Sequence, residues 1–376
     1  MEKKQYVEAD FSDRRRVICI SDMHGDMELF SALLDKVKLT ERDALVIIGD
    51  FSNKGANCRE MTELIYEMDK GENIYVLAGN GEKYNVDSYL NDRSWLLGYA
   101  KRWKGDIFSS WAMSLGYPQL DAENLDAACD AIDRNYGHII EWMGALPLYL
   151  ETPDTIFVHS GMREIPAEGM ADAKTLLSDG EFIYSGENNT EKRVIVGHYP
   201  TANFGRGYSS CGILIDEERN IIGIDGGINV RSWGRLNALI IKGGEKGGNV
   251  SCEYAHRFPM LEAARDIFGE NPVPPMQENW PDYRLALLQK GAEFALCRKE
   301  ISGQIGLVKN EHIGQDADGL YYNKCSNSFF MSARKGELLA LLDGDCGGYA
   351  YVMNDGGAMG FVPVGALGRV VKKNAL

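Results

Sequence analysis

Three short runs of apolar, mostly β-branched residues alternate with two segments of helical spacing near the start of the chain. The runs are Val17–Ile20, Ala44–Ile48 and Ile74–Leu77, and the helical segments are Met27–Lys38 and Arg59–Lys70. Continuous apolar runs of this length are typical of strands buried on both faces. A β-α-β-α-β opening of this kind predicts a parallel sheet, so the expected fold class is α/β.

The character of the sequence changes after about residue 258. Residues 271–283 contain four prolines among polar residues, which predicts a linker, and from about residue 292 short strands with glycine turns follow without clear helices. The 376 residues correspond to about two domains at roughly 150 residues each. We therefore expect an α/β domain over 14–258, a helical or proline-containing connector over 259–291 and a small β-barrel over 292–372.

Charge and composition exclude some classes of function. Lys and Arg number 40 and Asp and Glu 55, giving a net charge of −15, which argues against a general nucleic-acid binder. No apolar run approaches the roughly 18 residues of a membrane span, and no signal-peptide pattern is visible at the N-terminus. The eight cysteines are scattered singly, as expected of reduced thiols. We expect a cytoplasmic protein that does not bind membranes.

Potential metal ligands follow the three predicted strands and two further apolar runs, Thr155–Val158 and Arg193–Val196, which are also predicted to be strands. The ligands are Asp22, His24, Asp50, Asn80, His159 and His198. Ligands bind at the carboxyl ends of strands in open α/β sheets, and Asp22 and His24, two residues apart in extended chain, leave the same face. Taken singly, each such residue is more often a turn former, a helix cap or a core residue. Taken together, in this order and strand context, the six predict a metal site.

Two carboxylates, three imidazoles and one carboxamide suit a pair of divalent metal ions. Mn²⁺ is the expected metal, with Fe, Zn and Mg as alternatives. In a two-metal site the ions lie about 3.5–4 Å apart and lower the pKa of a bridging water towards neutrality. The resulting hydroxide attacks phosphorus in line, while both ions neutralise charge on the phosphoryl oxygens.

The ordered motifs resemble the calcineurin-like metallophosphoesterases, and in particular their PPP-type serine/threonine phosphatase branch. The matching segments are Asp22-Met23-His24-Gly25-Asp26, Gly49-Asp50…Gly55, Gly79-Asn80-Gly81-Glu82, His159-Ser160-Gly161 and Gly197-His198. The resemblance covers about residues 14–245 and implies a four-layer αββα sandwich. It also implies that Asp22, His24 and Asp50 hold one metal, that Asp50 bridges, and that Asn80, His159 and His198 complete the second site.

The chain departs from the family pattern at positions that matter for catalysis. Gly81 stands where the family has the histidine that acts as general acid, and Asn53 stands where the family has the aspartate that orients it. Lys54 stands where the family has a phosphate-binding arginine, and it keeps the positive charge but not the two-pronged hydrogen bonding of a guanidinium. A second arginine of the family is missing near Glu181. Arg163 is a candidate replacement, and a surface loop residue is the alternative.

The predicted function is hydrolysis of phosphate esters, including the esters of phosphorylated serine or threonine. Asp50, Asn80 and Lys54 are the expected catalytic residues, and Lys54, Asn80 and Arg163 are expected to bind the substrate. Loss of a general acid costs about 10²–10⁴-fold in rate, so good leaving groups should be preferred. The alternative is a weakened pseudo-phosphatase that binds phosphate or a protein partner and acts as a regulatory protein.

The C-terminal region resembles a Src-homology-3-like barrel. Residues 335–342 and Gly360-Phe361-Val362-Pro363 carry this likeness, which implies that a protein partner binds there. The usual groove tryptophans are missing, so a structural appendage is the alternative. His138, His256 and His312 lack any motif context, and we assign no function to them from the sequence.

Overall fold

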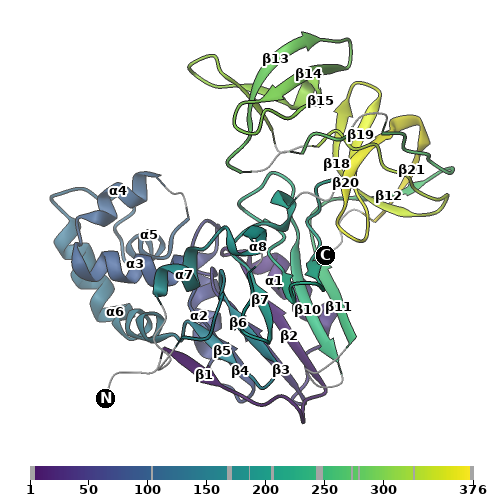
Figure 1. Ribbon diagram of the computed structural model, residues 1–376. Helices are drawn as coiled ribbons and strands as arrows, with labels where there is room; N and C mark the ends of the chain where they lie inside the picture. The colour runs from purple at the N-terminus through teal and green to yellow at the C-terminus, as the bar shows by residue number, and fades with distance from the viewer. Residues whose placement is uncertain are drawn as a thin grey trace. The chain divides into compact units, whose positions relative to one another are not determined.

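The computed structural model describes residues 5–102, 105–166, 172–185, 187–204, 207–242, 249–271, 274–277, 280–324 and 327–372 (Figure 1). The chain divides into two compact units. The first unit comprises Met1–Tyr199, Ile213–Val230 and Leu236–Tyr254. The second comprises Pro200–Gly212, Arg231–Arg235 and Ala255–Leu376.

One sheet of the first unit contains the three predicted N-terminal strands. Its order is β11-β10-β2-β3-β4, with bounds Asn249–Ala255, Leu236–Lys242, Arg16–Ile20, Asp43–Ile47 and Ile74–Val76. Strands β2, β3 and β4 are parallel, and they are connected by α1 (Met27–Val37) and α2 (Cys58–Met68). The predicted β-α-β-α-β opening is thus confirmed. Strand β10 pairs with β2 in the antiparallel direction and extends the sheet.

The other sheet of the first unit has six strands. Its order is β1-β5-β6-β7-β9-β8, with bounds Tyr6–Glu8, Tyr149–Glu151, Thr155–Val158, Arg193–Val196, Ile221–Gly223 and Leu214–Asp216. Strands β6, β7 and β9 run parallel, so β6 and β7 present their carboxyl ends at the same edge. This common edge is what lets residues far apart in sequence meet.

The two sheets of the first unit share one hydrophobic core. It combines Val17, Val46 and Leu239 of the five-stranded sheet with side chains of the six-stranded sheet such as Phe157 and Ile195. These β-branched, aromatic and aliphatic residues are buried because both sheets turn an apolar face inward. The predicted α/β fold class is confirmed, with two sheets packed against each other.

Helices flank the sheets and form a second core. The remaining helices are α3 (Asn80–Asn91), α4 (Trp95–Arg102), α5 (Ile107–Ser114), α6 (Leu125–Ala145), α7 (Ala173–Ser178) and α8 (Phe182–Ser185). Helices α3 to α6 pack through a cluster that includes Tyr89, Phe108 and Trp111. No helix within the described ranges is long and apolar enough to span a bilayer.

The second unit consists of antiparallel β-structure in two five-stranded sheets. The first has the order β15-β14-β13-β17-β16, with bounds Ile305–Lys309, Phe294–Lys299, Arg284–Lys290, Tyr321–Asn323 and Ile313–Gln315. The second has the order β20-β19-β18-β12-β21, with bounds Met359–Pro363, Tyr349–Met353, Leu338–Cys346, Met260–Ala263 and Leu367–Lys372. An all-β C-terminal region was predicted, and the structure resolves it into two sheets rather than one.

The two sheets of the second unit repeat one arrangement. In each, three consecutive antiparallel strands lead into a single 3₁₀ turn and then a further strand. The turns are η3 (Asn310–His312) after β15 and η4 (Val364–Ala366) after β20. The range 259–291, for which we expected a connector, contains β12 and β13, and Pro272 of its proline segment lies outside the described residues.

Candidate metal centre

The structure brings the six predicted ligands to one edge of the first unit. Asp22 and His24 follow β2, Asp50 follows β3, Asn80 begins α3, and His159 and His198 follow β6 and β7. Donor atoms of Asp22, Asp50 and His159 all lie within 4.8 Å of one another, and all three residues are buried. The His159 and His198 rings are 5.0 Å apart between centroids. Strands of both sheets therefore contribute to one cluster.

Asp50 lies between two of the histidines. Its Oδ2 is 3.9 Å from Nε2 of His24, and its Oδ1 is 3.6 Å from Nε2 of His159. Oδ1 of Asp22 approaches the same His24 nitrogen at 3.7 Å, and Oδ1 of Asn80 lies 3.0 Å from Nε2 of His159. The two oxygens of one carboxylate thus face two separate groups of donors.

Hydrogen bonds on the far side of two rings set their orientation. Nδ1 of His24 is 2.9 Å from Oδ1 of Asn53, and Nδ1 of His159 is 2.8 Å from the carbonyl oxygen of Ile48. Because these oxygens accept, each Nδ1 donates its hydrogen, and each Nε2 keeps a lone pair. Such outer contacts fix the tautomer of metal-binding histidines.

Glu82 clamps the loops that carry the ligands. Its buried carboxylate accepts hydrogen bonds from the backbone N–H groups of Gly79, Asp50, Phe51 and Ser52 at 2.9, 2.8, 3.0 and 3.0 Å. The loop after β3 and the start of α3 are thereby tied to one side chain. The sequence motif included Glu82, but sequence reasoning gave it no task. The only available signal was its fixed place three residues after Gly79.

The backbone is strained at four of the predicted ligands. Asp22, His24, Asp50 and His198 have φ angles of 54°, 45°, 55° and 65°, in the left-handed region that residues with a side chain rarely adopt. Such conformations persist where the surroundings over-determine them, and they cluster at functional sites. Gly49, next to Asp50, has φ 86°, and a Cβ atom there would lie 2.2 Å from the backbone nitrogen of Gly79.

Burial lowers the pKa of two histidines. The pKa of His24 falls to about 3, first because the ring is buried and then because the Lys54 ammonium is near. The pKa of His198 also falls to about 3, because of burial and then the neighbouring His159. Both imidazoles are neutral at neutral pH, which is the form that binds metal ions.

The two carboxyl groups shift in opposite directions. Burial, followed by the charge of Asp50, raises the pKa of Asp22. Burial also acts to raise the pKa of Asp50, but His159, Lys54 and His24 outweigh it, so this pKa is lowered. Asp50 is therefore the carboxylate that stays ionised most readily.

The donor set fits divalent metal ions. Oδ1 of Asp22 is buried and has no hydrogen-bond partner among the described residues. Nε2 of His159, which carries a lone pair, faces oxygen atoms of both Asn80 and Asp50. Several electron-pair donors thus converge, and a cation is the species that would stabilise them together.

Asn53 fills the space beside Gly81. A Cβ atom on Gly81 would meet Nδ2 of Asn53 at 2.3 Å and Oδ1 of Asp50 at 2.8 Å. The Gly81 N–H donates to that same Asp50 oxygen at 2.7 Å. The asparagine that sequence comparison treated only as the loss of an orienting aspartate therefore contacts His24 and occupies the place of a side chain at position 81.

Lys54 and Arg163, the two predicted substrate-binding cations, lie in different surroundings. The partly exposed Lys54 ammonium is 3.6 Å from Oδ2 of Asp50 and 3.4 Å from Nε2 of His24. It also lines a cleft of about 500 Å³ whose walls include Arg59, Ser109 and Ser110. The Arg163 guanidinium instead donates to Asp179, at 3.2 Å from Nε and 3.0 Å from Nη2.

Comparison with solved structures finds chains of limited similarity. A protein serine/threonine phosphatase from Saccharomyces cerevisiae is 15% identical, with 66% of this chain and 82% of that chain covered and a TM-score of 0.40. A metallophosphoesterase from Sphaerobacter thermophilus is 16% identical, with 65% and 89% covered and a TM-score of 0.36. With TM-scores this low, these likenesses add no argument about this chain.

The family assignment rests on the sequence match instead. No curated protein matches the chain. The model of the calcineurin-like phosphoesterase family matches residues 15–222, which is more than half of the 376 residues and includes all six predicted ligands. The chain belongs to the calcineurin-like phosphoesterase family.

Proposed function

We propose that this protein is a phosphoesterase that uses two divalent metal ions to hydrolyse phosphate esters. The observation that carries the proposal is the position of Asp50, whose two oxygens face Nε2 atoms of different histidines at 3.9 and 3.6 Å. A carboxylate placed in this way is suited to bridge two ions. Membership of the calcineurin-like phosphoesterase family agrees with it.

The ligands divide into two groups around Asp50. Asp22 and His24 would hold one ion with Asp50, and Asn80, His159 and His198 would hold the other, with Mn²⁺ as the first expectation. When bound, such ions supply Lewis acidity towards the phosphoryl oxygens and lower the pKa of water. Asn53 and the Ile48 carbonyl keep the lone pairs of His24 and His159 directed at this centre.

Lys54 is the residue proposed to bind the phosphoryl group. Its ammonium lies beside Asp50 and at the wall of the cleft, where an anionic substrate would meet it. Asn80 would add an amide contact. Arg163 stays a prediction as a second phosphate ligand, and its bond to Asp179 would have to be exchanged first.

Position 81 sets the expected substrate class. Gly81 has no side chain that could protonate a leaving oxygen, and such protonation contributes about 10²–10⁴-fold. Esters whose leaving oxygen is stable as an anion, such as aryl phosphates and phosphoanhydrides, should therefore react much faster than alkyl esters such as phosphoserine. A phosphoprotein substrate is the alternative, and its alkyl leaving oxygen would have to depart without a general acid at position 81.

The test is a series of aryl and alkyl phosphates of graded leaving-group pKa, assayed with Mn²⁺ while metal binding is measured by calorimetry. We expect a rate that falls steeply as the leaving-group pKa rises, and loss of both activity and one class of metal site in Asp50→Asn. Two bound ions with no turnover of any ester would overturn the enzyme proposal and favour the phosphate-binding regulatory alternative.

A pair of variants separates the two candidate cations. Lys54→Ala should raise KM for an aryl phosphate by about tenfold or more, since hydrogen bonds to charged groups are worth about 1.5–3 kcal/mol. Arg163→Ala is the matched control and should change KM less. The reverse order would assign phosphate binding to Arg163. A protein partner for the C-terminal β-structure stays a separate prediction.

A further inference from the structure

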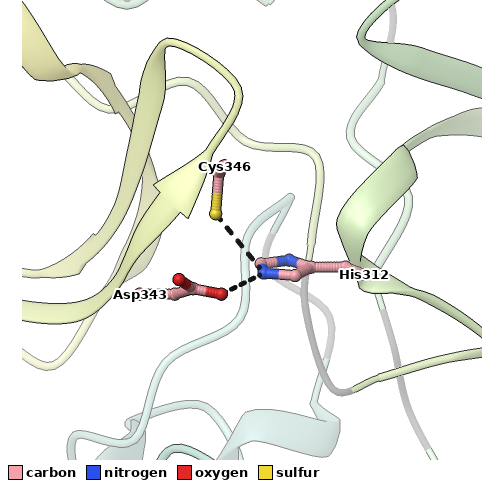
Figure 2. A group of neighbouring side chains, drawn as sticks. All are labelled: His312, Asp343 and Cys346. Atoms are coloured by element: carbon pink, nitrogen blue, oxygen red, sulfur yellow. Dashed lines mark hydrogen bonds and ion pairs between the residues drawn. The ribbon is translucent and has the colours of Figure 1, made fainter.

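Two side chains of β18, Asp343 and Cys346, converge on one nitrogen atom of His312, which ends the turn η3 in the same unit (Figure 2). Nε2 of His312 is 3.1 Å from Oδ2 of Asp343 and 3.6 Å from Sγ of Cys346. Donor atoms of the three residues all lie within 4.8 Å of one another. His312 and Cys346 are buried, and Asp343 is partly exposed. None of these residues belongs to the metal centre of the first unit.

The arrangement differs from a catalytic triad. In a cysteine or serine triad the nucleophile and the carboxylate contact opposite nitrogens of the imidazole. Here both approach the same nitrogen, and Nδ1 of His312 has no hydrogen-bond partner among the described residues. Burial, followed by the charge of Asp343, also raises the pKa of Cys346 to about 12, the reverse of an activated thiol.

Irregular strand pairing places Asp343 and Cys346 on the same side. Residues three apart on a regular strand point to opposite faces of the sheet. The pairing of β18 with β19 shifts register between Leu341 and Asp343 and again between Asp343 and Cys346. Such bulges re-aim side chains and are frequent next to functional sites. Without this second shift, only one of the two side chains would face His312.

A glycine turn lets Cys346 approach the segment that carries His312. Gly347 has φ 50°, and a Cβ atom there would lie 2.8 Å from Oε1 of Glu311 and 3.1 Å from Nζ of Lys309. These two charged groups are paired with each other, with Lys309 Nζ 3.3 Å from Oε2 of Glu311. Around the ring, Tyr351 and Phe361 lie 5.5 and 5.6 Å from His312 between centroids.

The distances match those around a tetrahedral zinc ion. With Zn–N and Zn–S bonds of about 2.0 and 2.3 Å, the ligand nitrogen and sulfur lie about 3.5 Å apart, and nitrogen and carboxylate oxygen about 3.3 Å apart. The structure has 3.6 and 3.1 Å for these pairs. A thiolate, an imidazole and a carboxylate together suit a borderline-soft ion better than Mg²⁺ or Ca²⁺.

We propose that His312, Asp343 and Cys346 bind a Zn²⁺ ion that links the two sheets of the second unit. His312 ends the turn η3, and the other two ligands lie on β18, so the ion would connect segments of separate sheets. On binding, the sulfur–hydrogen bond of Cys346 breaks, its proton goes to solvent, and the thiolate electron pair forms the bond to zinc. The fourth position would hold a water molecule on the exposed Asp343 side.

The test uses Co²⁺ as a spectroscopic substitute on the reduced, metal-free, full-length protein. A cobalt–thiolate bond produces an intense charge-transfer absorption, and the predicted ligands of the first unit include no sulfur. We therefore expect the absorption in the wild type and in Asp50→Asn, and we expect it to disappear when Zn²⁺ in excess of all the sites replaces the Co²⁺. Absence of the absorption with Co²⁺ in excess would overturn the proposal.

Variants identify the sulfur. Cys346→Ser should abolish the absorption and reduce the bound zinc by one equivalent, without changing hydrolysis by the first unit. Cys297→Ser is the matched control, because Cys297 is a buried cysteine of the same unit whose Sγ contacts the Ala295 carbonyl oxygen at 3.8 Å. Loss of the absorption in Cys297→Ser, with the absorption kept in Cys346→Ser, would also overturn the proposal. If Cys346→Ser does not fold, Asp343→Asn provides the test, because position 343 is partly exposed. This variant should lower Zn²⁺ affinity by at least about tenfold.

Discussion

A Cβ atom on Gly81 would lie 2.3 Å from Nδ2 of Asn53. The Asn53 amide cannot swing aside without cost, because it is buried and its Oδ1 is bonded to Nδ1 of His24 at 2.9 Å. Residues 53 and 81 are therefore physically coupled. Asparagine at 53 requires the smallest residue at 81, and glycine at 81 leaves room for the asparagine to hold the His24 ring.

This coupling predicts a non-additive effect on stability. Gly81→Ala should lower the free energy of unfolding by about 1–3 kcal/mol, the usual cost of overpacking a filled site. In an Asn53→Ala background the same change should cost less, since the clashing amide is gone. Urea unfolding of the four proteins of this cycle measures the difference. Equal losses in both backgrounds would show that Asn53 does not restrict position 81.

The hydrogen bond from His24 to Asn53 predicts an effect on metal affinity. Asn53→Ala removes the acceptor that fixes the ring, and loss of such an outer partner typically costs about 10–100-fold in affinity. Calorimetric titration with Mn²⁺ measures it directly. Asn57→Ala is the control, because Asn57 is an exposed residue of the same loop that makes no side-chain capping bond. Similar losses in both variants would contradict the assignment.

The raised pKa of Asp22 predicts proton release on metal binding. Burial and then Asp50 raise this pKa to about 7, so below that pH the carboxyl group is protonated and must lose its proton to bind a cation. Affinity for Mn²⁺ should increase by about tenfold per pH unit up to pH 7 and then level off. Titrations in buffers of different ionisation enthalpy should detect about one proton at pH 6 and fewer at pH 8. If the number of protons released were the same at pH 6 and pH 8, the raised pKa of Asp22 would be contradicted.

The four hydrogen bonds to Glu82 predict a large effect of a small change. Glu82→Gln keeps one acceptor oxygen and turns an NH₂ group towards backbone donors, so stability should fall by about 3 kcal/mol. Thermal unfolding measures the loss, and Mn²⁺ affinity should fall with it because the Asp50 loop is released. Glu67→Gln, at an exposed ion pair with Lys70, should change stability by less than about 1 kcal/mol. Equal losses of stability in Glu82→Gln and Glu67→Gln would mean that the hydrogen bonds to Glu82 do not hold the loops.

The sequence was sufficient to predict the part of the fold that holds the first site. β2 and β3 are recognisable because their residues are almost all apolar and both ends are marked by polar residues and glycine. Parallel strands of one sheet share one edge, so Asp22 and Asp50 could be expected to meet without knowing the order of the strands. His159 follows a strand of the other sheet, so its place beside them depends on how the two sheets pack. Their role as metal ligands stays a prediction.

Features that depend on tertiary packing were not predictable. His312 is separated from Asp343 and Cys346 by more than thirty residues, and no local motif signals a strand bulge that aims both at one ring. The task of Asn53 was missed because its contact with His24 depends on the loop path after β3. The PPP-type branch and the Src-homology-3-like barrel stay predictions. The two-sheet form of the C-terminal region was not foreseen, since short strands with glycine turns do not reveal how many sheets they form.

The path of the chain between the units limits how this protein can be taken apart. It passes from one unit to the other five times, at residues 199/200, 212/213, 230/231, 235/236 and 254/255. Deleting everything after residue 254 would leave Pro200–Gly212 and Arg231–Arg235 without the rest of the unit to which they belong. Arg235, for example, would lose the hydrogen bond that its guanidinium donates to the Asp355 carbonyl oxygen at 2.7 Å. The second unit therefore cannot be removed by a single C-terminal truncation. A shortened protein would need new loops in place of two segments, and exchanging this unit for that of another protein would require replacing three segments together.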